Sequence, residues 1–336
     1  MIEQKKTETV IAYTTATLFA PKQETKQLND LRIVFMGTPE FAVASLQKLV
    51  ENGCNIVGVI TAPDKPAGRG MEMQQSAVKK YAAEHGLNIL QPEKLKNPDF
   101  LQELSLLNAD LQIVVAFRML PELVWNMPPM GTINLHGSLL PQYRGAAPIN
   151  WAVINGEKET GVTTFKLQHE IDTGDILLQK SFPIGEKDNA GQVHDTMKEI
   201  GAEVLLRTVK GLAENTLKEV PQPSTFNHQP LKHAPKIFTE TCLIDFNKKT
   251  EDVYNLIRGL SPFPAAFTQL DNKKLKIFSA EKVPGNITES IGSHKTDGKT
   301  YLYFTCSDGY ISIKELQLEG KKKMLTEDFL RGYRFQ

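Results

Sequence analysis

The chain has 336 residues, 40% of them hydrophobic and 23% charged, and its 39 Lys and Arg balance its 39 Asp and Glu. This length predicts two domains of a soluble globular protein, and no stretch is long and apolar enough to span a bilayer. The three cysteines are far apart and form no Cys-x-x-Cys motif, which argues for a reducing compartment and against a disulfide framework or a zinc site.

The charge is unevenly distributed along the chain. Residues 231–336 carry 17 Lys and Arg against 13 Asp and Glu, a balance of +4, and the remainder carries −4. A mildly basic C-terminal domain is typical of a protein with a polyanionic partner. An ordinary solvated surface would explain the same excess.

Strand and helix patterns alternate through the first half of the chain. Residues 1–30 are predicted to be a flexible extension. After them we expect buried strands and amphipathic helices in turn: strands at 31–36, 55–61, 88–90, 111–116 and 132–136, and helices at 39–52, 76–85 and 98–107, with a loop at 62–73. This alternation predicts an α/β fold with a parallel, doubly wound sheet.

The first turn of that sheet is where a dinucleotide would bind. Gly37 makes the turn, Thr38 is expected to cap the next helix, and Pro39 takes its first position. The turn lacks the G-x-G-x-x-G fingerprint, and Glu40 would repel a pyrophosphate. A nicotinamide-dependent enzyme is therefore not expected, and no G-x-S-x-G, Walker or H-E-x-x-H motif occurs either.

The second half of the chain changes character after one long helix. We expect a helix at 146–154, a strand hairpin at 161–168 and 175–180, and a long helix at 192–212. Four prolines between residues 213 and 236 suit an extended linker. Beyond it, short strand-like runs and one helix at 251–260 predict a small β-barrel.

The most informative polar pair lies at the end of the strand at 132–136. Asn134 and His136 are two residues apart, so on a strand their side chains point the same way. A glycine, a serine and a proline follow and turn the chain. Open α/β sheets bind ligands at this end of their strands, so the pair is a candidate site. The alternative is a strand end with a satisfied core histidine.

The run NLHGSLLPQYR at 134–144 resembles the signature of the folate-dependent formyltransferases. Further matches follow in order: MGTPEFA at 36–42, PDKPAGRG at 63–70, RGAAPI at 144–149, GVT at 161–163, DTGD at 172–175 and LQLEGKKKMLTEDFLRG at 316–332. The ordered set covers residues 31–336. It is most similar to the branch of the family that acts on methionyl-initiator tRNA.

The resemblance implies a domain order and an activity. A Rossmann-like catalytic domain would span 31–212, a linker 213–236, and a C-terminal tRNA-binding domain similar to an OB-fold barrel 237–336. The enzyme would move the formyl group of 10-formyltetrahydrofolate to the amino group of methionyl-initiator tRNA, without a metal. We expect a cytoplasmic monomer.

The resemblance also implies roles for individual residues. Asn134, His136 and Asp172 would be the catalytic trio. Two segments would hold the folate, the first by backbone contacts to its pterin, and their residues are Phe117, Arg118, Met119 and Leu120, and Ser138, Leu139, Leu140 and Pro141.

Formyl transfer suits the implied trio chemically. It proceeds through a tetrahedral intermediate, and an aminoacyl amine, with a pKa of about 8 or below, needs little activation. One Asn134 N–H donor aimed at the oxyanion is worth roughly 3–4 kcal/mol. His136 can donate to the same oxygen or protonate N10 of the folate. Asp172 either orients a charged His136 or accepts the amine's proton, and the sequence leaves both roles open.

Two basic segments are candidates for tRNA contact. Arg69 lies between two glycines in a surface loop, where its guanidinium could reach an RNA end. Relatives continue this loop with lysines, whereas here Met71, Glu72 and Met73 follow. Lys321, Lys322 and Lys323 form a second basic segment. The alternatives are a mobile loop without a ligand and a solvated turn.

Four other functions compete with this interpretation. A formyltransferase acting on an amino-sugar nucleotide or on glycinamide ribonucleotide would share the run at 134–144, but the Arg69 loop and the run at 316–332 favour tRNA. A hydrolase of the folate donor would keep the trio without needing a basic domain. A non-catalytic RNA-binding protein would not need the trio.

Overall fold

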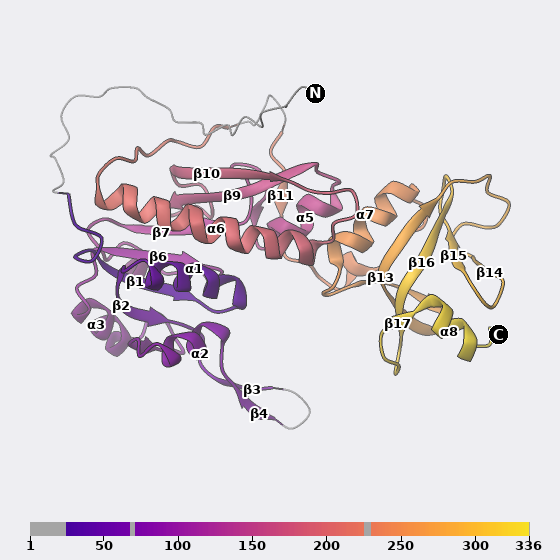
Figure 1. Cartoon of the computed structure of the whole chain (residues 1–336), viewed down its shortest axis with the longest axis horizontal. Helices are drawn as coiled ribbons and strands as arrows, with labels where there is room; N and C mark the ends of the chain where they lie inside the picture. Colours follow the sequence, from indigo (N-terminus) through magenta and orange to yellow (C-terminus); the bar gives the residue numbers. More distant parts are fainter. Residues whose placement is uncertain (1–24, 68–70, 225–229, 336) are drawn as a thin grey trace, which may run out of the picture.

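The computed structural model describes residues 25–67, 71–224 and 230–335. Figure 1 shows two parts side by side, an N-terminal part built around a twisted sheet and a C-terminal part built around a strongly curled one. The predicted extension at 1–30 lies mostly outside the described residues. Its last residues are described, and Lys26 donates its backbone N–H to the carbonyl of Ala213 at 3.0 Å.

The N-terminal sheet has the predicted parallel core. Its order is β10-β9-β7-β6-β1-β2-β5, and the neighbours from β7 to β5 pair in parallel. These parallel strands are β1 (Arg32–Gly37), β2 (Asn55–Ile60), β5 (Ile89–Leu90), β6 (Leu111–Val115) and β7 (Thr132–His136). The predicted hairpin, β9 (Glu159–Lys166) and β10 (Ile176–Pro183), extends the sheet, with β9 antiparallel to β7 and β10 antiparallel to β9.

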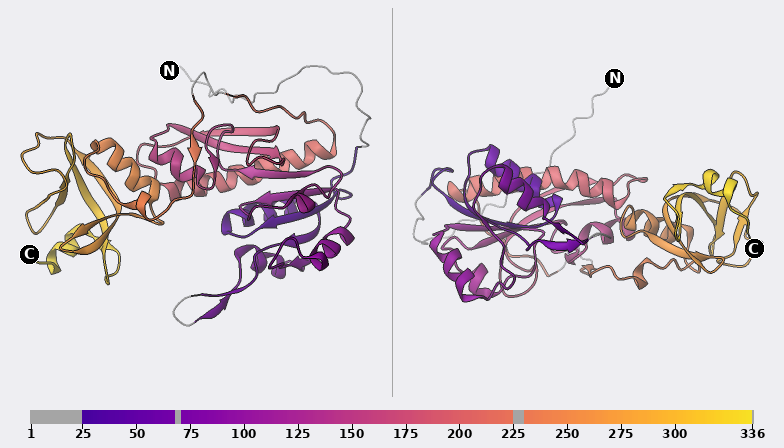
Figure 2. Two further views of the ribbon diagram at one scale, coloured as in Figure 1. Left: turned by 180° about the vertical axis from the view of Figure 1, so that it is seen from behind. Right: turned by 90° about the horizontal axis from the view of Figure 1, so that it is seen from below.

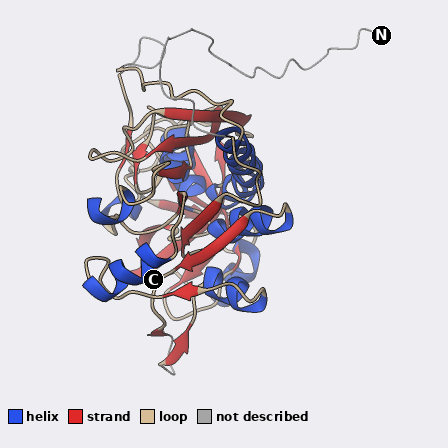
Figure 3. Cartoon of the chain, turned by 90° about the vertical axis from the view of Figure 1, so that its left-hand side faces the viewer, coloured by secondary structure: helices blue, strands red, loops and turns tan. Residues whose placement is uncertain are grey.

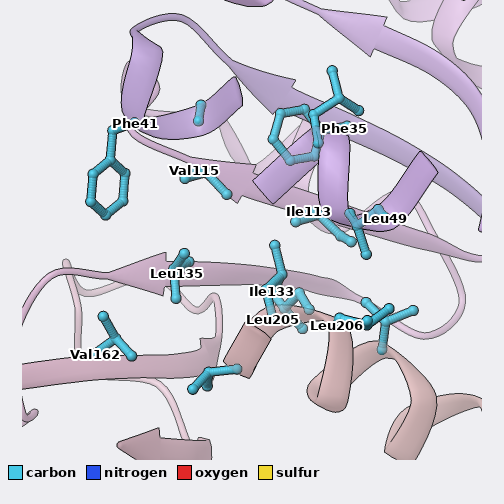
Figure 4. Packing of buried hydrophobic residues seen from close by; sticks show 14 of the residues in the cluster. Phe35, Phe41, Leu49, Ile113, Val115, Ile133, Leu135, Val162, Leu205 and Leu206 are labelled. Atoms are coloured by element: carbon cyan, nitrogen blue, oxygen red, sulfur yellow. The ribbon is translucent and has the colours of Figure 1, made fainter. Parts of the chain in front are cut away.

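Helices cover both faces of this sheet (Figure 3). They are α1 (Glu40–Glu51), α2 (Ala77–Glu84), α3 (Pro98–Leu106), α4 (Glu122–Trp125), α5 (Pro148–Ile154) and α6 (Ala190–Ala213). Successive residues of β1 face opposite sides: Ile33 and Phe35 pack with α1 and α6, whereas Val34 and Met36 pack with α3 and α4. Figure 4 shows Phe35 in one cluster with Leu49 of α1 and Leu205 of α6. Each such buried side chain stabilises the fold by about 1.5–3 kcal/mol, which explains the unbroken apolar run.

Two local predictions in this part were wrong. Helix α1 begins at Glu40 after Pro39, and no side chain caps it, so Thr38 is not its N-cap. The loop at 62–73 contains two short antiparallel strands, β3 (Lys65–Ala67) and β4 (Glu72–Gln74), which project from the sheet (Figure 1). Strands this short leave too little alternation to be detected in the sequence.

The C-terminal part is a curled antiparallel sheet that forms half of a barrel, so the predicted β-barrel is confirmed in outline. Its order is β12-β13-β16-β15-β14, with β17 paired to β16. The strands are β12 (Ala266–Leu270), β13 (Lys273–Val283), β14 (His294–Thr296), β15 (Leu302–Thr305), β16 (Tyr310–Leu318) and β17 (Met324–Leu325). A 3₁₀ turn (Glu240–Cys242) precedes α7 (Thr250–Leu260), and α8 (Thr326–Gly332) follows the sheet.

Helix α7 joins this half-barrel to the N-terminal part. Arg258 is only 6% exposed, and its guanidinium donates to the carbonyl of Asp188, just before α6, at 3.0 Å. Asn150 of α5 donates to the carbonyl of Gly259 at 2.7 Å. A cavity of about 520 Å³ lies beside this contact and includes Lys323 in its lining. A buried guanidinium is costly unless it is hydrogen-bonded. The bond from Arg258 to the Asp188 carbonyl and the bond from Asn150 to the Gly259 carbonyl therefore hold the two parts together.

The described residues of the predicted linker, 213–224 and 230–236, contact the N-terminal part at several points. The linker leaves the far end of α6 and returns along the N-terminal part (Figure 2). Val220 exchanges two backbone hydrogen bonds with Ile176, and β11 (His233–Ala234) pairs in parallel with β8 (Arg144–Gly145). Among the described residues no helix is long and apolar enough to cross a membrane.

Candidate active site

The candidate site begins at the carboxyl end of β7. The strand order reverses between β1 and β6, and in open α/β sheets ligands bind outside the carboxyl ends of the strands at such a switch point. Asn134 and His136 lie in the last three residues of β7, which pairs with β6 on one side and β9 on the other. Asn134 is half-buried and His136 is buried. Pairing on both sides fixes the backbone from which these two side chains project.

Two different groups face the two nitrogens of His136. Nε2 lies 2.9 Å from the backbone carbonyl of Tyr143. A carbonyl only accepts hydrogen bonds, so Nε2 carries the hydrogen. Nδ1 lies 3.9 Å from Oδ2 of Asp172, which is longer than a hydrogen bond. Nδ1 is therefore the nitrogen available for proton transfer, and a proton placed on it forms an ion pair with Asp172.

Asp172 lies in the loop between β9 and β10, and several contacts fix it there. Its Oδ2 accepts the backbone N–H of Gly145 at 2.9 Å, and its backbone is left-handed, with φ of 56°. Asp tolerates this conformation better than most residues. Two residues on, a Cβ at Gly174 would lie 1.6 Å from the carbonyl oxygen of Lys166, so only glycine fits. The structure thus brings Asp172 to His136 through tertiary contacts.

The segment after β7 is held by side chains from the neighbouring hairpin. Thr163 donates its hydroxyl to the carbonyl of Ser138 at 2.7 Å and accepts the N–H of Leu140 at 3.0 Å. Gln179 donates to the carbonyl of Leu140 at 2.8 Å. The side chain of Ser138 bonds the carbonyl of Gln142. Ser138, Leu140 and Pro141 are buried and Leu139 is partly buried, so this segment has a defined shape beside the trio.

The other predicted folate segment, at 117–120, follows β6. Arg118 donates to the carbonyls of Pro92 and Glu93, and its guanidinium lies 5.6 Å from the centre of the Phe117 ring. Met119 is 75% exposed. A cavity of about 570 Å³ lies here, and its largely apolar lining includes Leu95, Arg118, Met119, Leu120 and Leu123. An apolar cavity with few polar groups is the usual form of a small-molecule site.

The predicted tRNA contacts lie apart from the trio in the sequence. Lys321, Lys322 and Lys323 are exposed in the turn between β16 and β17. Lys323 is paired with Glu315 at 2.7 Å and lies over the ring of Phe278. Arg69 lies outside the described residues, which resume at Met71, a side chain that is 68% exposed.

The described part of the chain contains no cluster of metal ligands, and its three cysteines are buried. No group of three or more His, Cys, Asp and Glu side chains there could hold a metal ion. Burial raises the pKa of Cys54 to about 11 and that of Cys306 to about 12. Since the thiolate is the reactive form, neither cysteine is suited to nucleophilic catalysis.

Three contributors to this site were missed in the sequence. They are the carbonyl of Tyr143, the side chain of Thr163 and the side chain of Gln222, which bonds the Asp172 loop. Gln222 stands between two prolines, in the segment that the sequence predicts to be a linker. Its only local signal was a polar side chain in a segment otherwise suited to an extended connection.

Two family models match the chain over nearly its whole described length. The description "Formyl transferase" applies to residues 31–209, and "Formyl transferase, C-terminal domain" to residues 236–334. The chain therefore belongs to the formyl transferase family.

Its similar relatives agree on one activity. A Bacteroides fragilis protein named methionyl-tRNA formyltransferase is 56% identical over 309 residues, covering 90% of this chain and 95% of the relative. A protein of the same name from Phocaeicola vulgatus is 58% identical, with 91% and 96% covered.

Solved structures agree on the fold. The sugar 3N-formyltransferase WlaRD matches with a TM-score of 0.62 at 21% identity, covering 87% of this chain and 99% of that one. HypX from Aquifex aeolicus in complex with tetrahydrofolic acid matches with a TM-score of 0.60 at 20% identity, covering 91% of this chain and 48% of that one.

Proposed function

We propose that this chain transfers the formyl group of 10-formyltetrahydrofolate to the α-amino group of methionyl-initiator tRNA. The identity of the acceptor is supported by one observation: relatives that are 56–58% identical over almost the whole of both chains share the name methionyl-tRNA formyltransferase. WlaRD, crystallised with 5-N-formyl-tetrahydrofolate, and HypX with tetrahydrofolic acid support a folate donor.

The trio gives each proton of the reaction a place. The neutral amine attacks the formyl carbon, a C–N bond forms, and the carbonyl π electrons move to oxygen. Asn134 donates its amide N–H to this oxyanion. Asp172 takes the proton that the amine loses. Collapse of the intermediate breaks the bond to N10, and Nδ1 of the charged His136 protonates N10.

The geometry around His136 supports this assignment. Because Nε2 is bonded to the carbonyl of Tyr143, only Nδ1 can reach a reacting atom, and it faces Oδ2 of Asp172 at 3.9 Å. Because this distance is longer than a hydrogen bond, His136 and Asp172 are not bonded to each other, and each can contact a proton of the substrate. After turnover the proton on Asp172 returns to Nδ1, so the net result is one proton moved from the amine to N10.

The donor is proposed to lie between two segments. The backbone of Phe117–Leu120 would bind the pterin beside the apolar cavity, and Ser138–Pro141 would shape the wall nearer the trio. The rigid hydrogen bonding of the second segment by Thr163 and Gln179 supports such a wall.

The acceptor is proposed to lie across both parts of the molecule. Arg69 and the exposed Lys321 and Lys322 would contact the RNA, whereas Lys323 is already paired with Glu315. We further propose that the enzyme acts as a monomer in the cytoplasm, which size-exclusion chromatography with light scattering and cell fractionation would test.

One acceptor assay tests this proposal. Purified protein is given 10-formyltetrahydrofolate with methionyl-initiator tRNA, an amino-sugar nucleotide, glycinamide ribonucleotide or water alone. We expect formyl-methionyl-tRNA as the product. Formylation of a small-molecule acceptor without formylation of the tRNA, or release of formate alone, would overturn the proposal.

A further inference from the structure

The Asp172 loop is held from outside by one side chain of the linker. Gln222 donates its Nε2 to the carbonyl of Asp172 at 2.9 Å and to the carbonyl of Gly174 at 2.8 Å. Its Oε1 accepts from Nε and Nη2 of Arg144, at 3.1 and 2.6 Å. One amide therefore uses both of its donor hydrogens and its acceptor to join this loop to the segment after β7.

The Gln222 side chain binds the loop at Asp172, whose backbone is in the left-handed conformation. The carbonyl that it binds belongs to Asp172, whose φ of 56° is uncommon for a residue with a side chain. Such a conformation persists where the surroundings define it by several contacts. The backbone N–H of Gly145 holds the carboxylate of Asp172 at 2.9 Å.

The linker also contacts Tyr143 and Gly145, the two residues whose backbone groups bind His136 and Asp172. The carbonyl of Lys232 accepts the N–H of Tyr143 at 2.7 Å, and the Tyr143 carbonyl is the group that binds His136. Ala234 pairs with Gly145, the residue whose N–H binds Asp172. The linker residues Lys232 and Ala234 thus hold the two backbone segments that bind His136 and Asp172.

We propose that Gln222 is a positioning residue that sets the distance between Asp172 and Nδ1 of His136. It acts only through the backbone of the Asp172 loop and touches no reacting atom, and its role rests on the proposed function of the trio. Asp172 is productive only within a narrow range of positions, because small misplacements of catalytic groups are costly.

The first experiment compares two Gln222 variants with a matched control. Gln222→Ala removes all four hydrogen bonds, whereas Gln222→Glu keeps the acceptor for Arg144 and points a carboxylate at two carbonyl oxygens. The control, Trp151→Phe, removes a linker hydrogen bond to the carbonyl of Pro235 (2.8 Å) without touching the loop. We expect kcat to fall roughly 10- to 100-fold in both Gln222 variants, with KM for both substrates within about two-fold of wild type. Trp151→Phe should remain near wild type.

A double-mutant cycle separates positioning from general damage. If Gln222 acts through Asp172, then Gln222→Ala should cause no further loss of kcat in an Asp172→Asn background. Losses that multiply would overturn the proposal, as would unchanged kcat in the Gln222 variants or an equal loss in Trp151→Phe. Near-normal turnover of Asp172→Asn alone would instead overturn the proposed role of Asp172, so the two failures are distinguishable.

Discussion

Asn134 and His136 of the proposed catalytic trio are held differently from its third member, Asp172. Asn134 and His136 project from β7, whose backbone is paired with β6 and β9 inside the sheet. Asp172 lies on the loop that connects β9 and β10, and the contacts of Gly145 and Gln222 keep it in place. A sheet strand is ordered by many cooperative contacts, whereas a loop depends on a few specific ones. The trio therefore combines a rigid half with a half that single substitutions can loosen.

The largest expected effect is on the rigid half, at His136. His136→Ala removes Nδ1, the nitrogen free for proton transfer, so kcat should fall about 10²- to 10⁴-fold in single-turnover formylation. The β7 backbone should remain in place, and circular dichroism should match wild type. Turnover within two-fold of wild type would exclude His136 from the mechanism.

Asn134 should rank next, again without loosening the strand. Asn134→Asp keeps the size of the side chain but replaces the N–H donors by a negative charge that repels the oxyanion. We expect a decrease in kcat of about 10²- to 10³-fold, the range for removing one oxyanion donor, with folate affinity by fluorescence titration little changed. A loss confined to KM would show that Asn134 binds substrate rather than the transition state.

A smaller and mixed effect is expected in the loop half, at Gly174. Gly174→Ala places a Cβ against the carbonyl of Lys166, so the loop must move. We expect the free energy of unfolding to fall by about 1–3 kcal/mol and kcat to fall about 10-fold, read by urea melts and initial rates. Gly332→Ala, at the end of α8 where no atom lies within 4 Å of the added Cβ, is the control and should change neither quantity. Equal effects in both variants would argue against a tight loop.

The smallest effect is expected far from both halves. Lys321→Ala with Lys322→Ala should raise KM for tRNA a few-fold at low salt. It should also reduce the slope of log KM against log salt by about one for each phosphate that the turn no longer neutralises. The folate KM should stay constant. An unchanged salt slope would show that this turn is only a solvated surface.

Much of the fold was predictable because its signals are local. The unbroken apolar run of β1 and the helices predicted at 76–85 and 98–107, which form as α2 and α3, follow from neighbours within one turn or one strand. The errors fall where the signal is weak. Strands of two or three residues, such as β3 and β4, show no periodicity. At the start of α1, Pro39 takes the N-cap position in place of Thr38, and no side-chain cap is formed there.

The sequence by itself determined that Asn134 and His136 share one face of a strand, since a spacing of two sets that geometry without any distant contact. Only the tertiary structure decided which nitrogen of His136 faces Asp172, and that Gln222, 50 residues further along the chain, holds the Asp172 carbonyl. The physical reason is that hydrogen bonds across such separations arise from the packing of whole elements, so no local pattern around Gln222 distinguishes it from an ordinary linker residue.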